Sequence, residues 1–110
     1  MHGLTNPISE LDPGKLNEAF ALPVLGCVAA WADKDYSERV LGFEGVAGEI
    51  DMAWMNVDGG AVSLGHPVGA SGDRIVLHAM TAPKRLKLKW AIATECIGGG
   101  QGGAMLVERV

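Results

Sequence analysis

Hydrophobic residues recur at helical spacing in the segment that starts at residue 20. Apolar side chains also fill the other sides of this segment, so we expect a helix covered by protein on most faces. Proline is tolerated in the first turn of a helix but not in its interior, and Pro23 therefore places the helix start near residues 20–22. Asn17 and Glu18 then lie in the entry turn. The periodic positions are Phe20, Val24, Cys27, Val28 and Trp31.

Turn-forming residues mark off the segments on either side of this helix. Asn6-Pro7 and the Asp-Pro-Gly sequence at 12–14 predict a loop up to residue 14. Residues 33–38 form the most polar part of the chain. The run 53–64 is similar to a strand, interrupted at Asp58-Gly59-Gly60.

A second helix is predicted over residues 71–82. Ser71 is typical of an N-cap, and Asp73 in the first turn adds about 0.3–1 kcal/mol through the helix dipole. Pro83 is expected to end the helix, and the basic segment 84–89 to be a solvated connector. The apolar face of this helix consists of Ile75, Val76, Ala79 and Met80.

The end of the chain predicts a β-hairpin. Residues 90–97 form a strand-like run, 98–103 a glycine-rich loop and 104–108 a returning strand. Met105-Leu106-Val107 shows no alternation of apolar and polar side chains, so we expect this strand to be buried on both faces.

Composition limits the class of protein. The chain has 110 residues, of which 48% are hydrophobic and 20% charged, a balance typical of one globular domain spanning residues 1–110. The net charge of −4 gives no electrostatic reason for binding nucleic acid or a membrane. Two cysteines and no visible secretory signal favour a reducing, cytoplasmic location. The three histidines lack metal-site spacing, so no metal ion is expected.

Two loops carry residues that could act in catalysis. Cys96 precedes three glycines, and His66 lies in a glycine-spaced loop. A thiol beside an imidazole can ionise near neutral pH, and glycine N–H groups can approach a substrate oxyanion. Taken singly, however, a cysteine at a strand end is more often a small buried residue, and glycine runs are more often turns.

Three segments together closely resemble motifs of the thiolase family. GGAVSLGHPVGASG at 59–72 resembles the family's GHP segment, and CIGGGQG at 96–102 resembles its CxGGGxG signature. NEAFA at 17–21 resembles its NEAF motif. The order of the motifs and the spacing from His66 to Cys96 also match. The resemblance covers residues 3–110 and corresponds to the C-terminal portion of a thiolase subunit.

The resemblance implies a fold and a reaction. The fold is α/β, the C-terminal part of a layered αβαβα thiolase, with helices packed on a mixed sheet. Thiolases transfer acyl groups between a cysteine and coenzyme A, either cleaving a 3-ketoacyl-CoA or condensing two acyl-CoA molecules. This implies an acetyl-CoA acetyltransferase or 3-ketoacyl-CoA thiolase of fatty acid metabolism, with acyl-CoA as substrate and no permanently bound cofactor.

The resemblance also assigns roles to individual residues. Cys96 would be the acid/base thiol that exchanges a proton with the acyl α-carbon. His66 would activate the nucleophilic cysteine and donate to the thioester oxygen. Asn17 would hold the water that completes this oxyanion hole, and the N–H of Gly98 would contribute to a second one. Ala19 and Phe20 would line the pantetheine tunnel.

This sequence also departs from the family. The family's nucleophile is another cysteine, carried in the N-terminal portion, whereas Cys27 is expected to be a core residue of the first helix. Activity would therefore require an N-terminal thiolase portion as partner, in a homo-oligomer, and the 110 residues alone are expected to be inactive. Glu95 would disfavour the Cys96 thiolate if the two side chains met. His2 and His78 match no motif and are expected to be surface or helix-face residues.

A different class of function stays open. The chain could be a folded fragment or interaction module that keeps the geometry of the site without turnover. Such a module would expose apolar surface and associate with itself.

Overall fold

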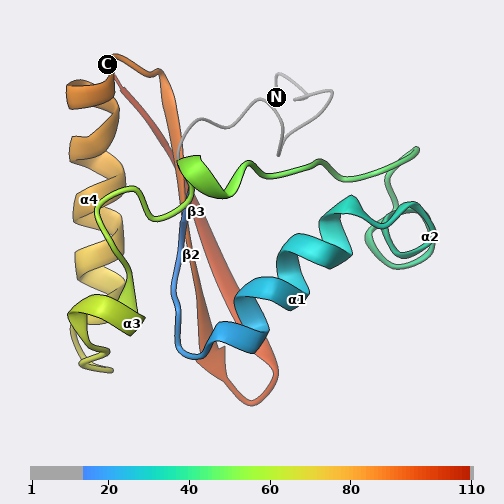
Figure 1. Cartoon of the computed structure of the whole chain (residues 1–110), viewed down its shortest axis with the longest axis horizontal. Helices are drawn as coiled ribbons and strands as arrows, with labels where there is room; N and C mark the ends of the chain where they lie inside the picture. Colours follow the sequence, from blue (N-terminus) through green and yellow to red (C-terminus); the bar gives the residue numbers. More distant parts are fainter. Residues whose placement is uncertain (1–13, 110) are drawn as a thin grey trace.

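The computed structural model describes residues 14–109 (Figure 1). The predicted loop before residue 14 and His2 lie outside the described residues. The elements of the described chain, in order, are β1 (Gly14–Leu16), α1 (Ala21–Ala32), α2 (Lys34–Tyr36), the π-helical turn η1 (Ser37–Leu41), the 3-10 turn η2 (Met52–Trp54), α3 (Ala61–Leu64), α4 (Ser71–Leu86), β2 (Trp90–Gly98) and β3 (Gln101–Glu108).

The strands form a mixed sheet in the order β1-β2-β3. β1 runs parallel to β2, with Leu16 opposite Thr94. β3 runs antiparallel to β2, with Trp90 opposite Glu108. The helices and the mixed sheet confirm the predicted α/β class, and the hairpin prediction is also confirmed. β1 is an addition to the predicted elements.

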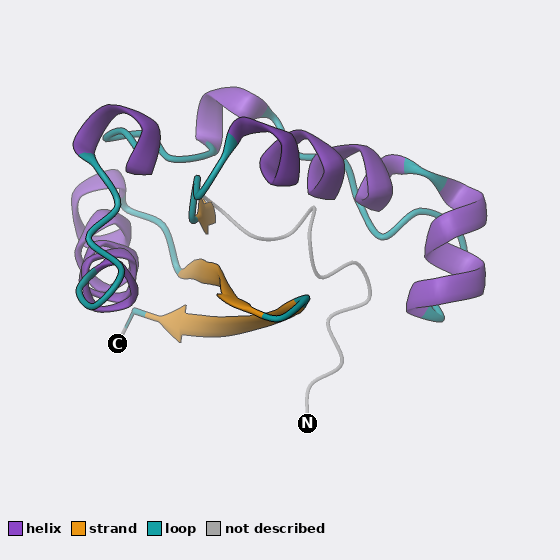
Figure 2. Cartoon of the chain, turned by 90° about the horizontal axis from the view of Figure 1, so that it is seen from below, coloured by secondary structure: helices purple, strands orange, loops and turns teal. Residues whose placement is uncertain are grey.

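The core lies between α4 and the sheet. Ile75 and Ala79 of α4 form one buried cluster with Ala91 and Ala93 of β2. Small alanine side chains on both elements let the helix approach the strand closely. In both Figure 1 and Figure 2, the strands lie between α4 on one side and α1 on the other.

Helix α1 begins at Ala21, as Pro23 predicted, and the proline falls in the first turn, where its missing N–H costs no hydrogen bond. The expectation that protein covers most of its faces is wrong for the described residues. Val24 is the one buried residue of α1, whereas Leu22 is 79% exposed. Cys27 is half-buried rather than a core residue. In the described part of the chain, nothing forms a full layer over the outer side of this helix.

The burial predicted for the last strand is wrong as well. Met105 and Leu106 are 51% and 44% exposed, although they point to opposite faces of the sheet. Of the three apolar residues in this run, Val107 alone packs against the buried cluster of α4 and β2. None of the helices described between residues 14 and 109 has the length and apolar character needed to cross a membrane.

Helix α4 differs from its prediction at both ends. It continues past Pro83 to Leu86, so the basic segment 84–89 is partly helical rather than a connector. Burial of Ala82 and Pro83 favours the helical path, and Lys87 ends it in a left-handed conformation with φ 59°. Ser71 is the first helical residue and not a cap, because its hydroxyl bonds elsewhere, as described below.

The strand predicted within residues 53–64 is also wrong. The Asp51 carboxylate accepts the N–H of Ala53 at 2.8 Å and closes the turn η2. Asn56 then adopts a left-handed conformation with φ 49°, which bends the chain away from an extended path. α3 follows, with Gly60 at its N-cap.

Candidate active site

The ends of two parallel strands bring Asn17 and Cys96 to one edge of the sheet. Asn17 follows β1 directly, and its N–H donates to the carbonyl of Thr94 at 2.9 Å. Cys96 lies two residues beyond Thr94 on β2. Because β1 and β2 are parallel, their carboxyl ends meet at the same edge.

His66 reaches this edge from the loop between α3 and α4. Its Nε2 lies 3.5 Å from Nδ2 of Asn17, and its Nδ1 lies 2.6 Å from Oγ of Ser71. The Ser71 hydroxyl donates to the Pro67 carbonyl at 3.2 Å, so it accepts the proton of His66 Nδ1. This arrangement leaves Nε2 of the neutral ring with a lone pair, the form in which histidine acts as a general base.

Asn17 is suited to both protonation states of His66. The residue is 5% exposed, and its Oδ1 has no hydrogen-bond partner among the described residues. As placed, the amide Nδ2 faces the lone pair of neutral His66. A half-turn of the Asn17 amide would present Oδ1 to the N–H of the protonated ring. This turn would break no hydrogen bond of Oδ1, because Oδ1 has none among the described residues.

Cys96 is exposed on β2, and the neighbouring carboxylate points elsewhere. The Glu95 carboxylate lies against Gly72 at the start of α4. Adjacent residues of a strand point to opposite faces, so the Cys96 thiol faces away from that carboxylate. The structure therefore does not bring together the pair that would have disfavoured the thiolate.

Gly98 lies at the end of β2, where the hairpin register shifts between Cys96 and Gly98. Gly98, Gly99 and Gly100 have φ values of 92°, 60° and 73°, a left-handed run that strongly favours glycine. The three glycines thus form the tight turn of the hairpin and place the Gly98 N–H two residues from the thiol.

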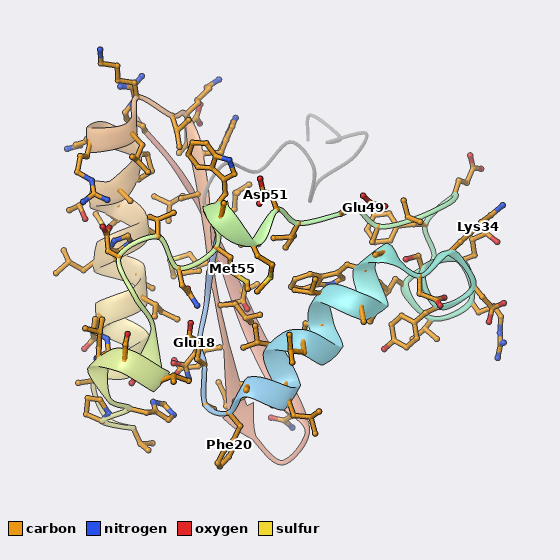
Figure 3. The ribbon with its side chains drawn as sticks, viewed as in Figure 1. Glu18, Phe20, Lys34, Glu49, Asp51 and Met55 are labelled. Atoms are coloured by element: carbon orange, nitrogen blue, oxygen red, sulfur yellow. The ribbon has the colours of Figure 1, made fainter. Side chains whose placement is uncertain are left out.

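Ala19 and Phe20 connect β1 to α1. Phe20 is 75% exposed and points away from the body of the molecule (Figure 3). A hollow of about 420 Å³ lies nearby, between α1, η2 and α3, and neither Ala19 nor Phe20 lines it. The lining is mainly apolar and includes Glu18, Ala21, Val24, Leu25, Met52 and Met55.

Two residues that the sequence analysis did not single out tie these loops together. Asn56 accepts the Leu16 N–H at 3.2 Å and donates to the Leu16 carbonyl at 2.9 Å. Asn56 also donates to one oxygen of the Glu18 carboxylate at 2.7 Å. The other oxygen of this carboxylate accepts the Val62 N–H at 3.0 Å. The one sequence signal for Asn56 was its residue type near the turn-forming Asp58-Gly59-Gly60, since asparagine tolerates the left-handed conformation.

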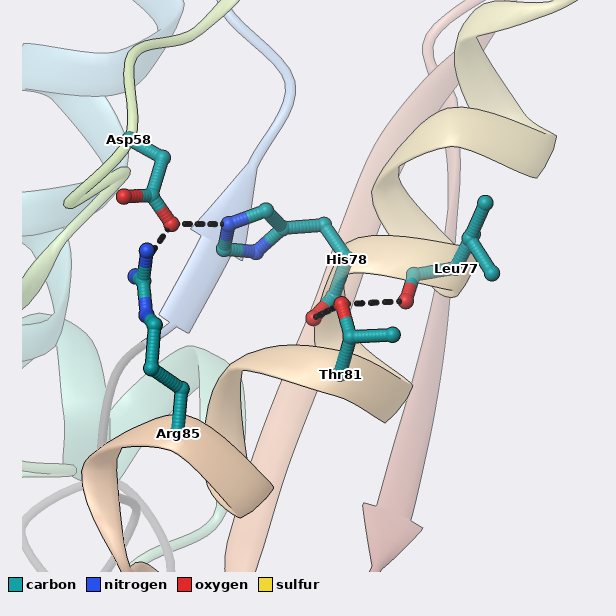
Figure 4. Close-up of polar contacts among 5 residues, drawn as sticks. All are labelled: Asp58, Leu77, His78, Thr81 and Arg85. Carbon is teal, nitrogen blue, oxygen red and sulfur yellow. Dashed lines mark hydrogen bonds and ion pairs between the residues drawn. The ribbon is translucent and has the colours of Figure 1, made fainter.

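A separate ionic cluster ties the loop before α3 to α4 (Figure 4). The Asp58 carboxylate accepts from Arg85 at 2.5 Å and also pairs with His78. His78 lies on a helix face, as expected, but it is a partner of Asp58 rather than a free surface residue. Among residues 14–109, no group of three or more His, Cys, Asp or Glu side chains could hold a metal ion.

This cluster predicts a pH-dependent contribution to stability. The hydrogen bond from Arg85, followed by that from His78, lowers the pKa of Asp58 from 3.8 to about 2. A lowered pKa means that Asp58 stabilises the fold above pH 3.8 and that this contribution is lost as the pH falls toward 2. The Asp58 side chain is 35% exposed, and solvent screening limits the contribution to about 1 kcal/mol or less.

Urea unfolding of the wild-type chain and of Asp58→Asn should test this contribution. The wild type is expected to be the more stable protein at pH 6, and the difference between the two should shrink between pH 4 and pH 2. A difference in unfolding free energy that stays constant over this range would contradict the proposed cause.

Comparison with known proteins agrees with the motifs in the sequence. Residues 2–109 match the family model described as "Thiolase, C-terminal domain". The chain is 39% identical over 94 residues to a 3-ketoacyl-CoA thiolase of Shewanella sp. (strain ANA-3). The aligned region covers 86% of this chain and 22% of that relative. The chain is 40% identical over 103 residues to the beta-ketoadipyl-CoA thiolase of Acinetobacter baylyi, covering 94% of the chain and 22% of the relative.

A solved structure shows the same fold. The crystal structure of the Bacillus anthracis acetyl-CoA acetyltransferase matches with a TM-score of 0.66 and 34% sequence identity. The match covers 90% of this chain and 21% of that one. The chain therefore spans about a fifth of the length of the relatives it matches. The family model covers nearly all of its residues, and the chain belongs to the thiolase family as a C-terminal domain.

Proposed function

We propose that this domain supplies the acid/base and oxyanion-binding half of a thiolase active site. The reaction is acyl transfer between coenzyme A and an enzyme cysteine, by thiolysis of a 3-ketoacyl-CoA or by condensation of two acyl-CoA molecules. The observation that carries the proposal is the contact between His66 Nε2 and Asn17 at the sheet edge where Cys96 lies. Residues far apart in the sequence thereby lie at one edge of the sheet.

Each group suits one part of this chemistry. Cys96 exchanges a proton with the α-carbon, for which an exposed thiol is needed. His66, whose Nε2 carries a lone pair in the neutral ring, takes the proton of the nucleophilic cysteine and then donates to the thioester oxygen. Asn17 holds a water molecule at the first oxyanion hole, and the Gly98 N–H contributes to the second.

We assign the remaining parts of the site to an N-terminal thiolase portion. That portion carries the nucleophilic cysteine and most of the contacts to the nucleotide of coenzyme A. It would cover the exposed apolar side chains of α1, such as Leu22 and Leu25, which are 79% and 57% exposed. Ala19 and Phe20 would line the pantetheine path at this boundary. The assembled enzyme would be a cytoplasmic homo-oligomer of fatty acid metabolism that holds no permanent cofactor.

A chimera tests the proposed function. The C-terminal region of the Acinetobacter baylyi beta-ketoadipyl-CoA thiolase is replaced by this chain, and thiolysis of acetoacetyl-CoA and beta-ketoadipyl-CoA is measured. We expect turnover by the chimera and none by the 110 residues alone, because the nucleophile is elsewhere. Turnover by the chain alone would show that the nucleophile was misassigned.

The same measurement distinguishes the enzymatic role from the alternative role of an interaction module. A chimera that folds and assembles like the parent enzyme, yet cleaves neither substrate, would contradict the enzymatic role. That result would favour an interaction module, for which the exposed apolar side chains of α1 are the supporting observation.

A further inference from the structure

We infer that Glu18 and Asn56 are positioning residues that fix His66 against Asn17. The contacts themselves are features of this chain, whereas calling the positioned pair catalytic rests on the proposed function. The hydrogen bonds of Glu18 and Asn56 go to the loops and not to His66 or Cys96. They act by holding the two loops that carry Asn17 and His66.

Asn56 holds the residues on both sides of Asn17. Its side-chain amide bonds to both the N–H and the carbonyl of Leu16, as a neighbouring strand would. Its Nδ2 also donates to the Glu18 carboxylate at 2.7 Å. The Asn56 backbone N–H donates to the Gly14 carbonyl at 3.1 Å. With residues 16 and 18 fixed in this way, the direction of the Asn17 side chain between them is fixed as well.

Glu18 extends the connection to the loop that carries His66. Its second oxygen accepts the N–H of Val62 at 3.0 Å, in the first turn of α3. α3 ends at Leu64, and Gly65, its C-cap, donates its N–H to the Ala61 carbonyl at 2.9 Å. His66 follows directly. One carboxylate thus joins the end of β1 to the turn that delivers the imidazole.

The local chemistry favours glutamate at position 18 and glycine at position 60. Both partners of the carboxylate are N–H donors, so each oxygen must accept, and glutamine has only one acceptor oxygen. A Cβ added to Gly60 would overlap the Glu18 carboxylate. Gly60 has an extended backbone, with φ −133°, so a side chain there would displace the Glu18 carboxylate without straining the backbone.

Two variants displace the carboxylate by different means. Glu18→Gln removes one acceptor, and Gly60→Ala pushes the carboxylate out of its position without changing any charge. Glu38→Gln is the matched control, since the Glu38 carboxylate accepts the Gly45 backbone N–H at 3.3 Å in a separate part of the fold. All three are made in the 110-residue chain.

The measurement is the ¹⁵N chemical shift of both imidazole nitrogens of His66, from long-range ¹H–¹⁵N spectra above the pH at which the ring protonates. In the wild type we expect a large separation between the two shifts, because Ser71 holds the proton on Nδ1. Glu18→Gln and Gly60→Ala should each reduce that separation to about half or less, because a displaced imidazole loses its contacts with Asn17 and Ser71 and exchanges between tautomers. His78 is observed in the same spectrum and should not change.

Each outcome decides the inference. Reduced separation in both folded variants, with Glu38→Gln and His78 unchanged, supports it. Unchanged His66 shifts in either folded variant overturn it. Unfolding of both variants overturns it as well, because the Glu18 carboxylate would then hold the whole fold together rather than position His66. No acyl-CoA is needed, so a failed chimera leaves this result intact, and a failed positioning test leaves the proposed reaction intact.

Discussion

Alanine in place of Cys96 is expected to lower deuterium exchange at the α-carbon of acetyl-CoA by about 10²–10⁴-fold in the chimera. General acid–base catalysis by a positioned side chain contributes rate factors of about this size, and alanine can neither give nor take a proton. The exposed position of Cys96 at the end of β2 and the direction of Glu95 away from it leave this thiol available for the reaction.

Acylation should survive the same substitution. The acyl group is expected on the cysteine of the N-terminal portion, so mass spectrometry of the chimera mixed with acetyl-CoA should still show an acetyl adduct in Cys96→Ala. Cys27→Ala serves as the matched control, because Cys27 is the other free thiol of the chain and lies half-buried on α1. Normal exchange in Cys96→Ala, with a folded protein, would exclude the role assigned to this thiol.

Local signals in the sequence predicted the elements whose geometry is set within a few residues. Pro23 correctly placed the start of α1, because a proline constrains only the turn around it. The glycines after Cys96 correctly predicted the hairpin, because successive left-handed conformations are a local requirement.

Elements that depend on partners distant in the sequence were missed. β1 has three residues and forms by pairing with β2, so no periodicity could reveal it. Pro83 lies inside α4 because the buried face of the helix outweighs a local preference to stop. The alanines of β2 and their helix partners are visible as apolar residues, but their close packing is a property of the assembled layers.

The candidate site shows the same division. The motif resemblance predicted Asn17, His66, Cys96 and Gly98, and the structure brings the first two within 3.5 Å. Glu18 was left in an entry turn, and its contact with Asn56 joins residues 38 positions apart. A single sequence gives no pairing of this kind, and the wrong strand prediction for residues 53–64 hid helix α3 and the turn at Asn56.

Ile75→Ala is expected to lower the free energy of unfolding by about 2–5 kcal/mol, the usual cost of removing a buried isoleucine side chain. Ile75 is 9% exposed and is the largest member of a buried cluster whose other buried residues are alanines, which cannot refill the space. Leu77→Ala is the matched control on the same helix, because Leu77 is 63% exposed and its loss should cost less than about 0.5 kcal/mol. Urea unfolding followed by circular dichroism gives both values. Equal losses in the two variants would mean that the packing of α4 on β2 does not hold this domain together. The expected difference would instead show that the platform beneath Ser71 and His66 depends on one side chain.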